Sequence, residues 1–215
     1  MDLTWAGEKF TLLADRGCYR CDAQTLIVSD LHLGKAAAFR GAGVPVPEAS
    51  TDSTLARLDR MIAATGARRM LVLGDFYHAR SGRTAALDAA VQAWRDRHAA
   101  LSISMVIGNH DEHAGDPPSE LGIENLGASW EDGAIEFVHE PPTRAARPTM
   151  CGHVHPAIAL SDRAGFTHRR ACFWFGATVA LLPATGEFTG TKSITPRHGD
   201  RVYLIADGEV AAVLG

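Results

Sequence analysis

Short apolar runs alternate with amphipathic segments in the first half of the chain. Residues 25–28, 69–74 and 101–107 are rich in Leu, Ile, Val and Met, which is typical of strands buried on both faces. Residues 50–65 and 84–99 instead carry apolar positions at helical spacing, and a shorter helix is predicted at 36–40. This alternation of strand and helix predicts a parallel sheet with helical crossovers.

The pattern changes from Trp130 onward. Several short runs of strand-forming residues are separated there by Gly, Pro and Asp, and few positions have helical spacing. This second half predicts another sheet, antiparallel or mixed, packed on the first. Because no repeat or low-complexity linker divides the 215 residues, we expect a single domain over residues 1–215.

Composition and charge exclude some classes of protein. Hydrophobic residues make up 46% of the chain and charged residues 21%, as in soluble globular proteins. The net charge of −4 gives no overall basic field, although bound divalent metal ions would add local positive charge. The first ten residues lack the apolar core of a signal peptide, and no stretch is long enough to span a membrane. We therefore expect a cytoplasmic protein.

Two of the four cysteines, Cys18 and Cys21, form a C-x-x-C motif. Such a motif is compatible with a redox role or with half of a zinc site. No second C-x-x-C or C-x-x-H follows it, so we interpret the pair as incidental thiols, reduced in the cytoplasm.

Polar residues follow the apolar runs at the points where the predicted strands end. In open α/β sheets, ligands bind at the carboxyl edge of the strands. Six of the ten histidines lie at or just after such exits, an arrangement that random placement would not produce. The polar residues at these exits are Asp30, His32, Asp75, His78, Asn109, His110, His139, His153 and His155.

The oxygen and nitrogen donors of this set suit borderline divalent metals. Seven ligands exceed the needs of one tetrahedral ion and predict two ions. Asp75 is the candidate bridge between them, because two neighbouring cations need a shared anionic ligand. Such a pair lowers the pKa of water, so that hydroxide can attack phosphorus near neutral pH. We expect Mn, with Fe, Co, Ni and Zn as alternatives.

The ordered motifs SDLHLG, GDFYH, GNHD, a single His and GHVH resemble the calcineurin-like metallophosphoesterase superfamily over residues 25–156. The resemblance implies a four-layer α/β/β/α sandwich with two mixed sheets. It also implies that His110 acts beside the phosphate as a charge stabiliser or as a proton donor to the leaving oxygen. It further implies one metal held by Asp30, His32, Asp75 and His155, and a second held by Asp75, Asn109, His139 and His153.

Further segments, among them GDFYHAR, HEPP, GHVHPAIAL and ACFWF, are similar to the ligase-associated DNA damage response endonucleases. These bacterial phosphoesterases are grouped with a DNA ligase, a helicase and an exonuclease. The resemblance implies a metal-dependent endonuclease for single-stranded DNA in repair. One alternative is a phosphodiesterase or phosphatase for a small molecule such as a cyclic nucleotide. Another is a metal-free scaffold, against which the complete ligand set argues.

Other residues have a functional and a plain interpretation. His78, three residues after Asp75, could reach the scissile phosphate or be a surface loop residue. Lys35 could bind a substrate phosphate as a point charge or simply be solvated. The basic tracts Arg169–Arg170 and 192–201 could contact a DNA backbone or be solvated loops.

Overall fold

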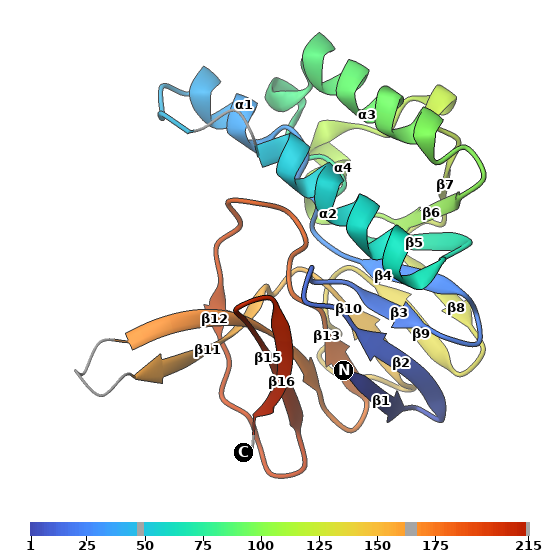
Figure 1. The fold of residues 1–215 in the computed structure, drawn as a ribbon, viewed down its shortest axis with the longest axis vertical. Helices are drawn as coiled ribbons and strands as arrows, with labels where there is room; N and C mark the ends of the chain where they lie inside the picture. The colour runs from blue at the N-terminus through green and yellow to red at the C-terminus, as the bar shows by residue number, and fades with distance from the viewer. Residues whose placement is uncertain (47–49, 162–166, 214–215) are drawn as a thin grey trace.

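The computed structural model describes residues 1–46, 50–161 and 167–213. Two β-sheets pack face to face, and helices cover the outer face of the first sheet (Figure 1). None of the helices in the described part of the chain is long and apolar enough to span a membrane.

The first sheet holds the predicted parallel strands in its second half. Strands β4 to β7 are parallel, whereas β1 to β4 pair antiparallel with one another. The strands lie side by side in chain order: β1 (Asp2–Trp5), β2 (Glu8–Leu12), β3 (Cys18–Arg20), β4 (Thr25–Val28), β5 (Arg69–Leu73), β6 (Ser102–Val106) and β7 (Ile123–Asn125).

Helices connect the parallel strands, and the three predicted helices are confirmed. The Oγ1 atom of Thr84 accepts a hydrogen bond from the backbone N–H of Leu87 and so caps the third one. The short helix α4, which begins directly after the third predicted strand, was not predicted. The helices are α1 (Lys35–Gly41), α2 (Ser50–Thr65), α3 (Ala85–Arg97) and α4 (Asn109–Ala114), with 3-10 turns η1 (Arg80–Gly82) and η2 (Ser119–Leu121).

The second sheet is mixed, as predicted. Strands β9, β10 and β13 are parallel, and the long β12 pairs antiparallel with β11, β13 and β15. Its strands are β8 (Ser129–Asp132), β9 (Ile135–Val138), β10 (Thr149–Cys151), β11 (Pro156–Ser161), β12 (Thr167–Phe175), β13 (Val179–Leu181), β14 (Lys192–Ser193), β15 (Arg201–Ala206) and β16 (Glu209–Val213).

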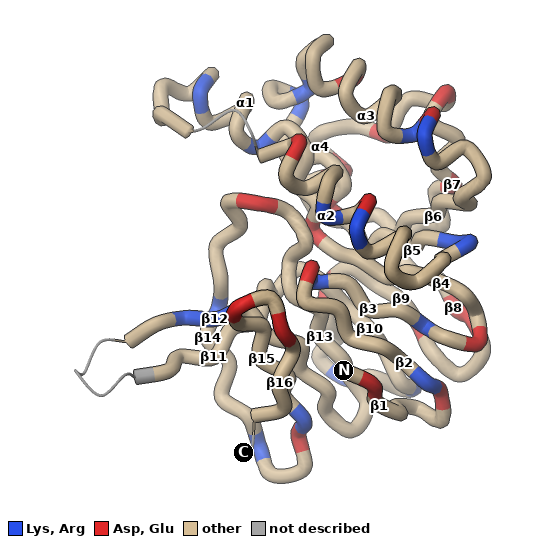
Figure 2. The backbone as a smooth tube through the Cα atoms, in the orientation of Figure 1, with Lys and Arg blue, Asp and Glu red and all other residues tan. Residues whose placement is uncertain are grey.

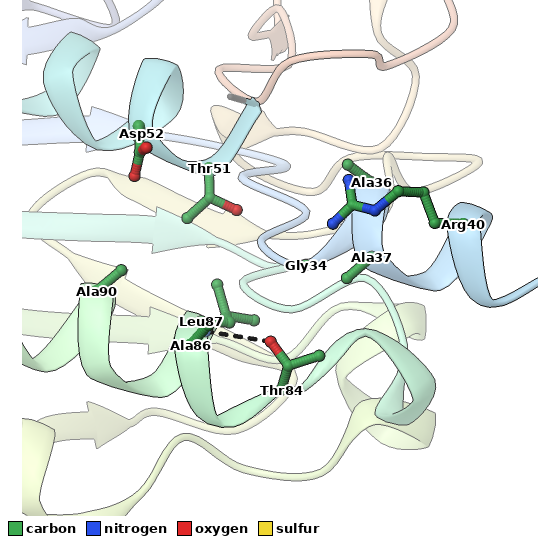
Figure 3. A pocket seen from close by; sticks show the side chains of 10 residues that line it. All are labelled: Gly34, Ala36, Ala37, Arg40, Thr51, Asp52, Thr84, Ala86, Leu87 and Ala90. Carbon is green, nitrogen blue, oxygen red and sulfur yellow. Dashed lines mark hydrogen bonds between the residues drawn. The ribbon is translucent and has the colours of Figure 1, made fainter. Parts of the chain in front are cut away.

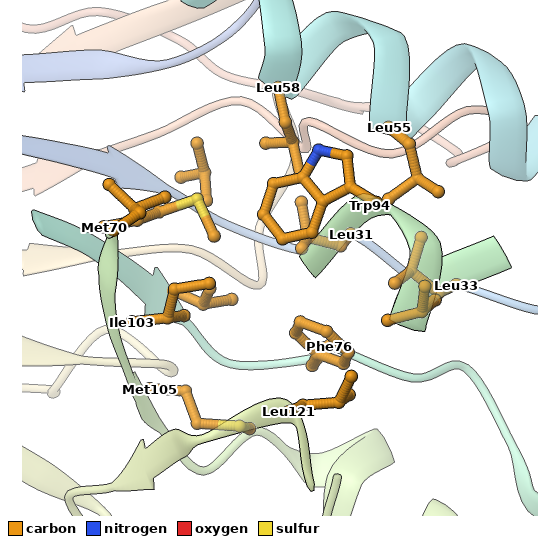
Figure 4. Packing of buried hydrophobic residues seen from close by; sticks show 14 of the residues in the cluster. Leu31, Leu33, Leu55, Leu58, Met70, Phe76, Trp94, Ile103, Met105 and Leu121 are labelled. Atoms are coloured by element: carbon orange, nitrogen blue, oxygen red, sulfur yellow. The ribbon is translucent and has the colours of Figure 1, made fainter. Parts of the chain in front are cut away.

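The central strands are apolar on both faces because both faces are covered. Leu26 of β4 belongs to the core under α2 and α3. The buried indole of Trp94 lies in the same core, beside Leu55 and Leu58 of α2 (Figure 4). Ile27, the residue after Leu26, points to the other side and packs against Phe137 and other residues of the second sheet. The period-2 alternation of a strand thus divides one apolar run between two cores.

The outer face of the second sheet differs from what the family resemblance implies. No helix follows Leu121 in the described residues, so these residues form a helix–sheet–sheet arrangement without a fourth, helical layer. A small cluster around Cys172 and Val202, with Trp174 and Leu204 against it, fills that face. The expected α/β fold with two mixed sheets is confirmed.

Candidate metal centre and active site

The predicted site residues come together where the carboxyl ends of two parallel groups of strands meet. Turns after β4, β5 and β6 of the first sheet carry Asp30, His32, Asp75, His78, Asn109 and His110. The second sheet supplies His139, which follows β9, and His153 and His155, which lie between β10 and β11.

Several of these residues have a strained backbone. Asp30, His32, Asp75, His153 and His155 have φ angles of 52°, 45°, 55°, 63° and 51°, in the left-handed region that non-glycine residues rarely adopt. They are half of the ten non-glycine residues with positive φ in the described residues. Such strain persists where the surrounding structure imposes it, and it concentrates at functional sites.

One group of donor atoms contains acceptors that face one another. Nδ1 of His139 donates to the carbonyl oxygen of Leu73 at 2.9 Å, which leaves its Nε2 as an acceptor. That Nε2 lies 3.0 Å from Oδ1 of Asn109, and Nδ1 of His153 lies 3.1 Å from both atoms. Because neither Nε2 of His139 nor Oδ1 of Asn109 carries a hydrogen, a cation suits this group of atoms.

A second group is built around a fully buried carboxylate. Nδ1 of His155 donates to the carbonyl oxygen of Gly190 at 2.9 Å, and its Nε2 lies 3.2 Å from Oδ1 of Asp30. Burial opposes charge on both groups, yet their attraction outweighs it, so the pKa of Asp30 is lowered and that of His155 is raised. This pair therefore holds a proton or another cation between its two acceptor atoms.

Asp75 lies between these two groups. Its Oδ2 is 3.6 Å from Nε2 of His32 and 3.5 Å from Nε2 of His139. Its Oδ1 accepts the backbone N–H of His110 at 2.9 Å. Burial raises the pKa of Asp75 and lowers that of His32 to about 2, which keeps the imidazole neutral and able to ligate a metal. This position is the one that a bridging ligand requires.

A third group consists of imidazoles without a carboxylate. The rings of His78 and His110 stack with centroids 4.7 Å apart, and Nδ1 of His78 lies 3.4 Å from Nδ1 of His32. Nδ1 of His110 donates to the carbonyl oxygen of His78 at 2.7 Å, so its Nε2 is the atom that can exchange a proton. Burial lowers the pKa of His78 to about 4. This group can transfer a proton, but it supplies no negatively charged ligand for a metal ion.

Lys35 lies next to this group, at the start of α1. Its Nζ is 5.7 Å from the ring centroid of Phe39, and the Phe39 ring in turn contacts His78. Burial lowers the pKa of Lys35, while the carboxylates of Asp75 and Asp30 act in the opposite direction. The side chain is thus placed where it can meet a substrate phosphate.

Asp111 has a role that the sequence analysis did not assign. Its buried carboxylate accepts backbone N–H groups of Asp75 at 2.7 Å, Phe76 at 2.9 Å, Tyr77 at 3.3 Å and Gly108 at 3.0 Å. These hydrogen bonds hold the strained turn that carries Asp75. The only signal in the sequence is a carboxylate directly after the Asn-His pair.

Glycines let the backbone approach two of the carboxylates. A Cβ on Gly108 would lie 2.3 Å from Oδ1 of Asp75, and one on Gly152 would lie 2.6 Å from Oδ2 of Asp30. Both contacts are too short for a carbon atom. The glycines of the GN and GH motifs are therefore required by packing against the site.

The segment between β13 and β14 forms another wall of the site, which the sequence analysis did not foresee. The N–H of Thr185 donates to the carbonyl of Ser29 at 2.9 Å, and that of Gly186 to the carbonyl of Asp30 at 3.1 Å. Further along, the N–H of Lys192 donates to the carbonyl of His155 at 3.0 Å. The segment is thus tied to both Asp30 and His155.

A pocket of about 290 Å³ lies elsewhere, between α1, α2 and α3 (Figure 3). Arg40 and Asp52 are the charged residues among those that line it in the described part of the chain. None of the candidate metal ligands borders it, so the donor atoms and not this hollow define the site. It is lined by Gly34, Ala36, Ala37, Arg40, Thr51, Asp52, Thr84, Ala86, Leu87 and Ala90.

The fold separates the two ends of the basic tract 192–201. Lys192 lies beside His155, whereas the guanidinium of Arg201 donates to the carbonyl of Thr4 in β1 at 2.9 Å. The C-x-x-C pair joins no group of candidate metal ligands within the described residues, and burial raises the pKa of Cys18. Neither Arg201 nor the cysteines belong to the candidate site.

The model of the family described as Calcineurin-like phosphoesterase matches residues 23–177. The chain belongs to this family and is a metal-dependent phosphoesterase. The crystal structure of Pseudomonas putida nuclease MPE is similar over 99% of both chains, with 39% sequence identity and a TM-score of 0.85. This similarity agrees with the ligase-associated endonuclease branch indicated by the sequence.

A second solved structure, that of the phosphoesterase Yfce from E. coli, is 16% identical with a TM-score of 0.44, over 88% of this chain and 97% of that one. No curated protein sequence shows a significant match to this chain.

Proposed function

We propose that this protein is a DNA endonuclease that hydrolyses phosphodiesters in single-stranded DNA with two divalent metal ions, and that it acts in DNA repair in the cytoplasm. The observation that carries the proposal is the position of Asp75 between two groups of donor atoms. The nuclease named in the structural comparison supports DNA as the substrate. Association with a DNA ligase, a helicase and an exonuclease remains part of the proposal.

The donors present fit two cations. Asp30, His32, Asp75 and His155 would hold one, and Asp75, Asn109, His139 and His153 the other. Carboxylate, amide and imidazole donors accept Mn, Fe, Co, Ni or Zn, so metal availability selects among them, and we propose Mn. When bound, such a pair supplies a nucleophile near neutral pH and offsets the charge of the phosphate oxygens.

The imidazole of His110 would give a proton to the leaving oxygen. Its Nδ1 is fixed by the carbonyl of His78, and its backbone N–H is fixed by Asp75, so Nε2 keeps one orientation. His78 stacks on it and shields one side of the ring from water. Lys35 would bind a non-bridging phosphate oxygen.

The test uses the manganese-loaded protein with three substrates: circular single-stranded DNA, duplex plasmid and a chromogenic phosphodiester. Circular DNA has no ends, so its cleavage identifies an endonuclease. We expect cleavage of the single-stranded circle and of the diester, with much slower attack on the duplex. Hydrolysis of the diester without any cleavage of the circle would instead identify a small-molecule phosphodiesterase.

A further inference from the structure

Three strands of the second sheet form a projecting unit next to the site, which we call the arm: β11, β12 and β14. Pro156, the first residue of β11, directly follows the candidate ligand His155. Strands β11 and β12 pair from Ala157 opposite Ala171 to Ser161 opposite Thr167 and extend away from the body of the molecule (Figure 1). β14 pairs with the start of β11.

The arm carries cations that are not neutralised. Arg169, Arg170 and Lys192 are exposed, and none of the described residues forms an ion pair with them. Many cations elsewhere do have carboxylate partners, among them Arg20, Arg57, Arg60, Arg69, Arg97 and Arg147. Other exposed cations, such as Lys9 and Arg68, also form no ion pair with a described residue, so what distinguishes the arm is that three such cations lie within three neighbouring strands.

Acidic residues are also missing from the described strands of the arm and from most of the chain that follows them. Residues 156–161, 167–186 and 188–199 contain no Asp or Glu, although the whole chain has a net charge of −4. Figure 2 shows the blue positions of β12 and β14 beside the site-proximal end of the arm. Asp207 and Glu209 lie on the neighbouring β15–β16 hairpin and pair with none of the three cations.

Register places the cations at a useful distance from the site. Arg170 lies opposite Ile158 and Arg169 opposite Ala159, two and three residues beyond Pro156. At ~3.3 Å per residue, these positions are about 7 and 10 Å along the strand. A DNA strand in a helix advances by about 3.4 Å per nucleotide along the axis, and an extended single strand advances further, so this distance corresponds to about one to three nucleotides.

Adjacent residues of a strand point to opposite faces, so the two arginines flank the arm. Arg169 shares its face with Phe173 in the core between the sheets, and Arg170 shares the other face with Cys172 and Trp174. Lys192 adds a cation next to Pro156. A flexible anionic strand that leaves the site along the arm therefore meets positive charge on whichever face it follows.

We propose that the arm binds phosphates of a single DNA strand a few nucleotides away from the bond that is cleaved. This inference rests on the proposed function. It adds a surface that binds strands long enough to reach from the metal site to the arm, and that a dinucleotide does not reach. An acidic protein segment is the competing occupant, and the experiment separates the two.

The experiment compares wild type with the double variant Arg169→Gln/Arg170→Gln. The control variant Lys9→Gln/Arg68→Gln removes the same charge from exposed positions of the first sheet. With manganese present, kcat/KM is measured for a 20-nucleotide strand and for a dinucleotide at several salt concentrations. Thermal unfolding checks the fold, since substitutions at exposed positions usually change stability little.

Each phosphate contact contributes roughly 0.7 to the salt slope for a single strand, and a strand on one face of the arm meets one of the two arginines, so the arm variant loses about 0.7 units with the 20-mer. Between ~50 and ~200 mM salt, wild type then loses about 2.6-fold more kcat/KM than the arm variant. The ratio of kcat/KM for the 20-mer to that for the dinucleotide also falls, while the control variant keeps the wild-type slope and ratio.

Three results overturn the inference. The arm variant could match the control on the 20-mer, as expected if the arm binds an acidic protein. It could lose the same factor on both lengths, which would place the effect at the metal site. A wild-type protein that hydrolyses a chromogenic diester but neither DNA substrate would overturn the proposed function as well, and this result is recognisable without any variant.

Discussion

The two sheets contribute to the site in different ways. Donors of the first sheet stand on turns held by neighbours in the same half of the chain, above all by the Asp111 carboxylate on the backbone of residues 75–77. Two of the three donors of the second sheet, His139 and His153, are instead oriented by partners outside it. Nδ1 of His139 donates to Leu73 of β5, and the backbone N–H of His153 donates to the Asp30 carboxylate at 3.0 Å.

This difference shows that one part of the site is oriented by contacts within the first sheet and its turns. The other part is oriented only by contacts between the two sheets. Leu73 O and the Asp30 carboxylate belong to the first sheet, so His139 and His153 take their orientation only when the two sheets pack. The apolar core between the sheets, which includes Phe137 and Met150, therefore also aligns the candidate metal ligands. The following predictions test this comparison, from the largest expected effect to the smallest.

The residue shared by both donor groups should have the largest effect. Asp75→Ala should reduce hydrolysis of every substrate to below about 1% of wild type, because it removes a ligand from both proposed cations and loss of even a ligand's partner costs about 10–100-fold. The fold should persist in metal-free protein, since a buried carboxyl with a raised pKa contributes little to stability there. The measurements are rates in excess manganese and thermal unfolding with chelator. Retention of more than a few per cent activity would remove Asp75 from the bridge.

His110 separates proton transfer from metal binding. His110→Ala should lower turnover by about 10²- to 10⁴-fold, the usual effect of a general acid or charge stabiliser, with metal content unchanged. His113→Ala, on the exposed side of the same helix, is the matched control. Metal analysis beside the kinetics decides the matter, because loss of metal together with the imidazole would make His110 a ligand.

Gly186 tests the contact between the β13–β14 segment and the first sheet. A Cβ there would lie 2.3 Å from the carbonyl oxygen of Leu31 and 2.8 Å from that of Asp30. Gly186→Ala should therefore lower the free energy of unfolding by about 1–3 kcal/mol, as overpacking usually does. Gly190→Ala is the control, because a Cβ at Gly190 meets nothing within 4 Å. Equal denaturant midpoints for the two variants would contradict the close packing.

Asp111 tests the locally held half of the site. Asp111→Asn keeps the shape but replaces one acceptor oxygen by an NH₂ group that faces backbone N–H donors. Manganese affinity should fall about 10–100-fold, as it does when a partner of a ligand is removed, and excess manganese should restore most of the activity. Glu112→Gln, exposed on the same helix, should bind manganese like wild type. An unchanged affinity in Asp111→Asn would show that the Asp75 turn is held by other contacts.

Much of this site was predictable because its chemistry is local in sequence. Each apolar run is followed directly by polar residues. The same stretch of sequence therefore predicts both the strand and the donor at its end, as with Val28 and Asp30. The parallel order of the strands then brings these exits to one edge. Bounds of the predicted helices and strands agree with the structure to within about two residues, as expected where apolar periodicity is strong.

Other features depended on contacts that no local pattern carries. Asp111 binds backbone 34 to 36 residues away, and the His153 N–H finds the Asp30 carboxylate across 123 positions. Positive φ angles at Asp30 and His155 likewise follow from the packing around them. The sequence by itself determined which donors exist and at which strand ends they stand. Only the tertiary structure decided which atoms face one another, because segments far apart in the sequence come within hydrogen-bonding distance only where the two sheets pack on their shared apolar core.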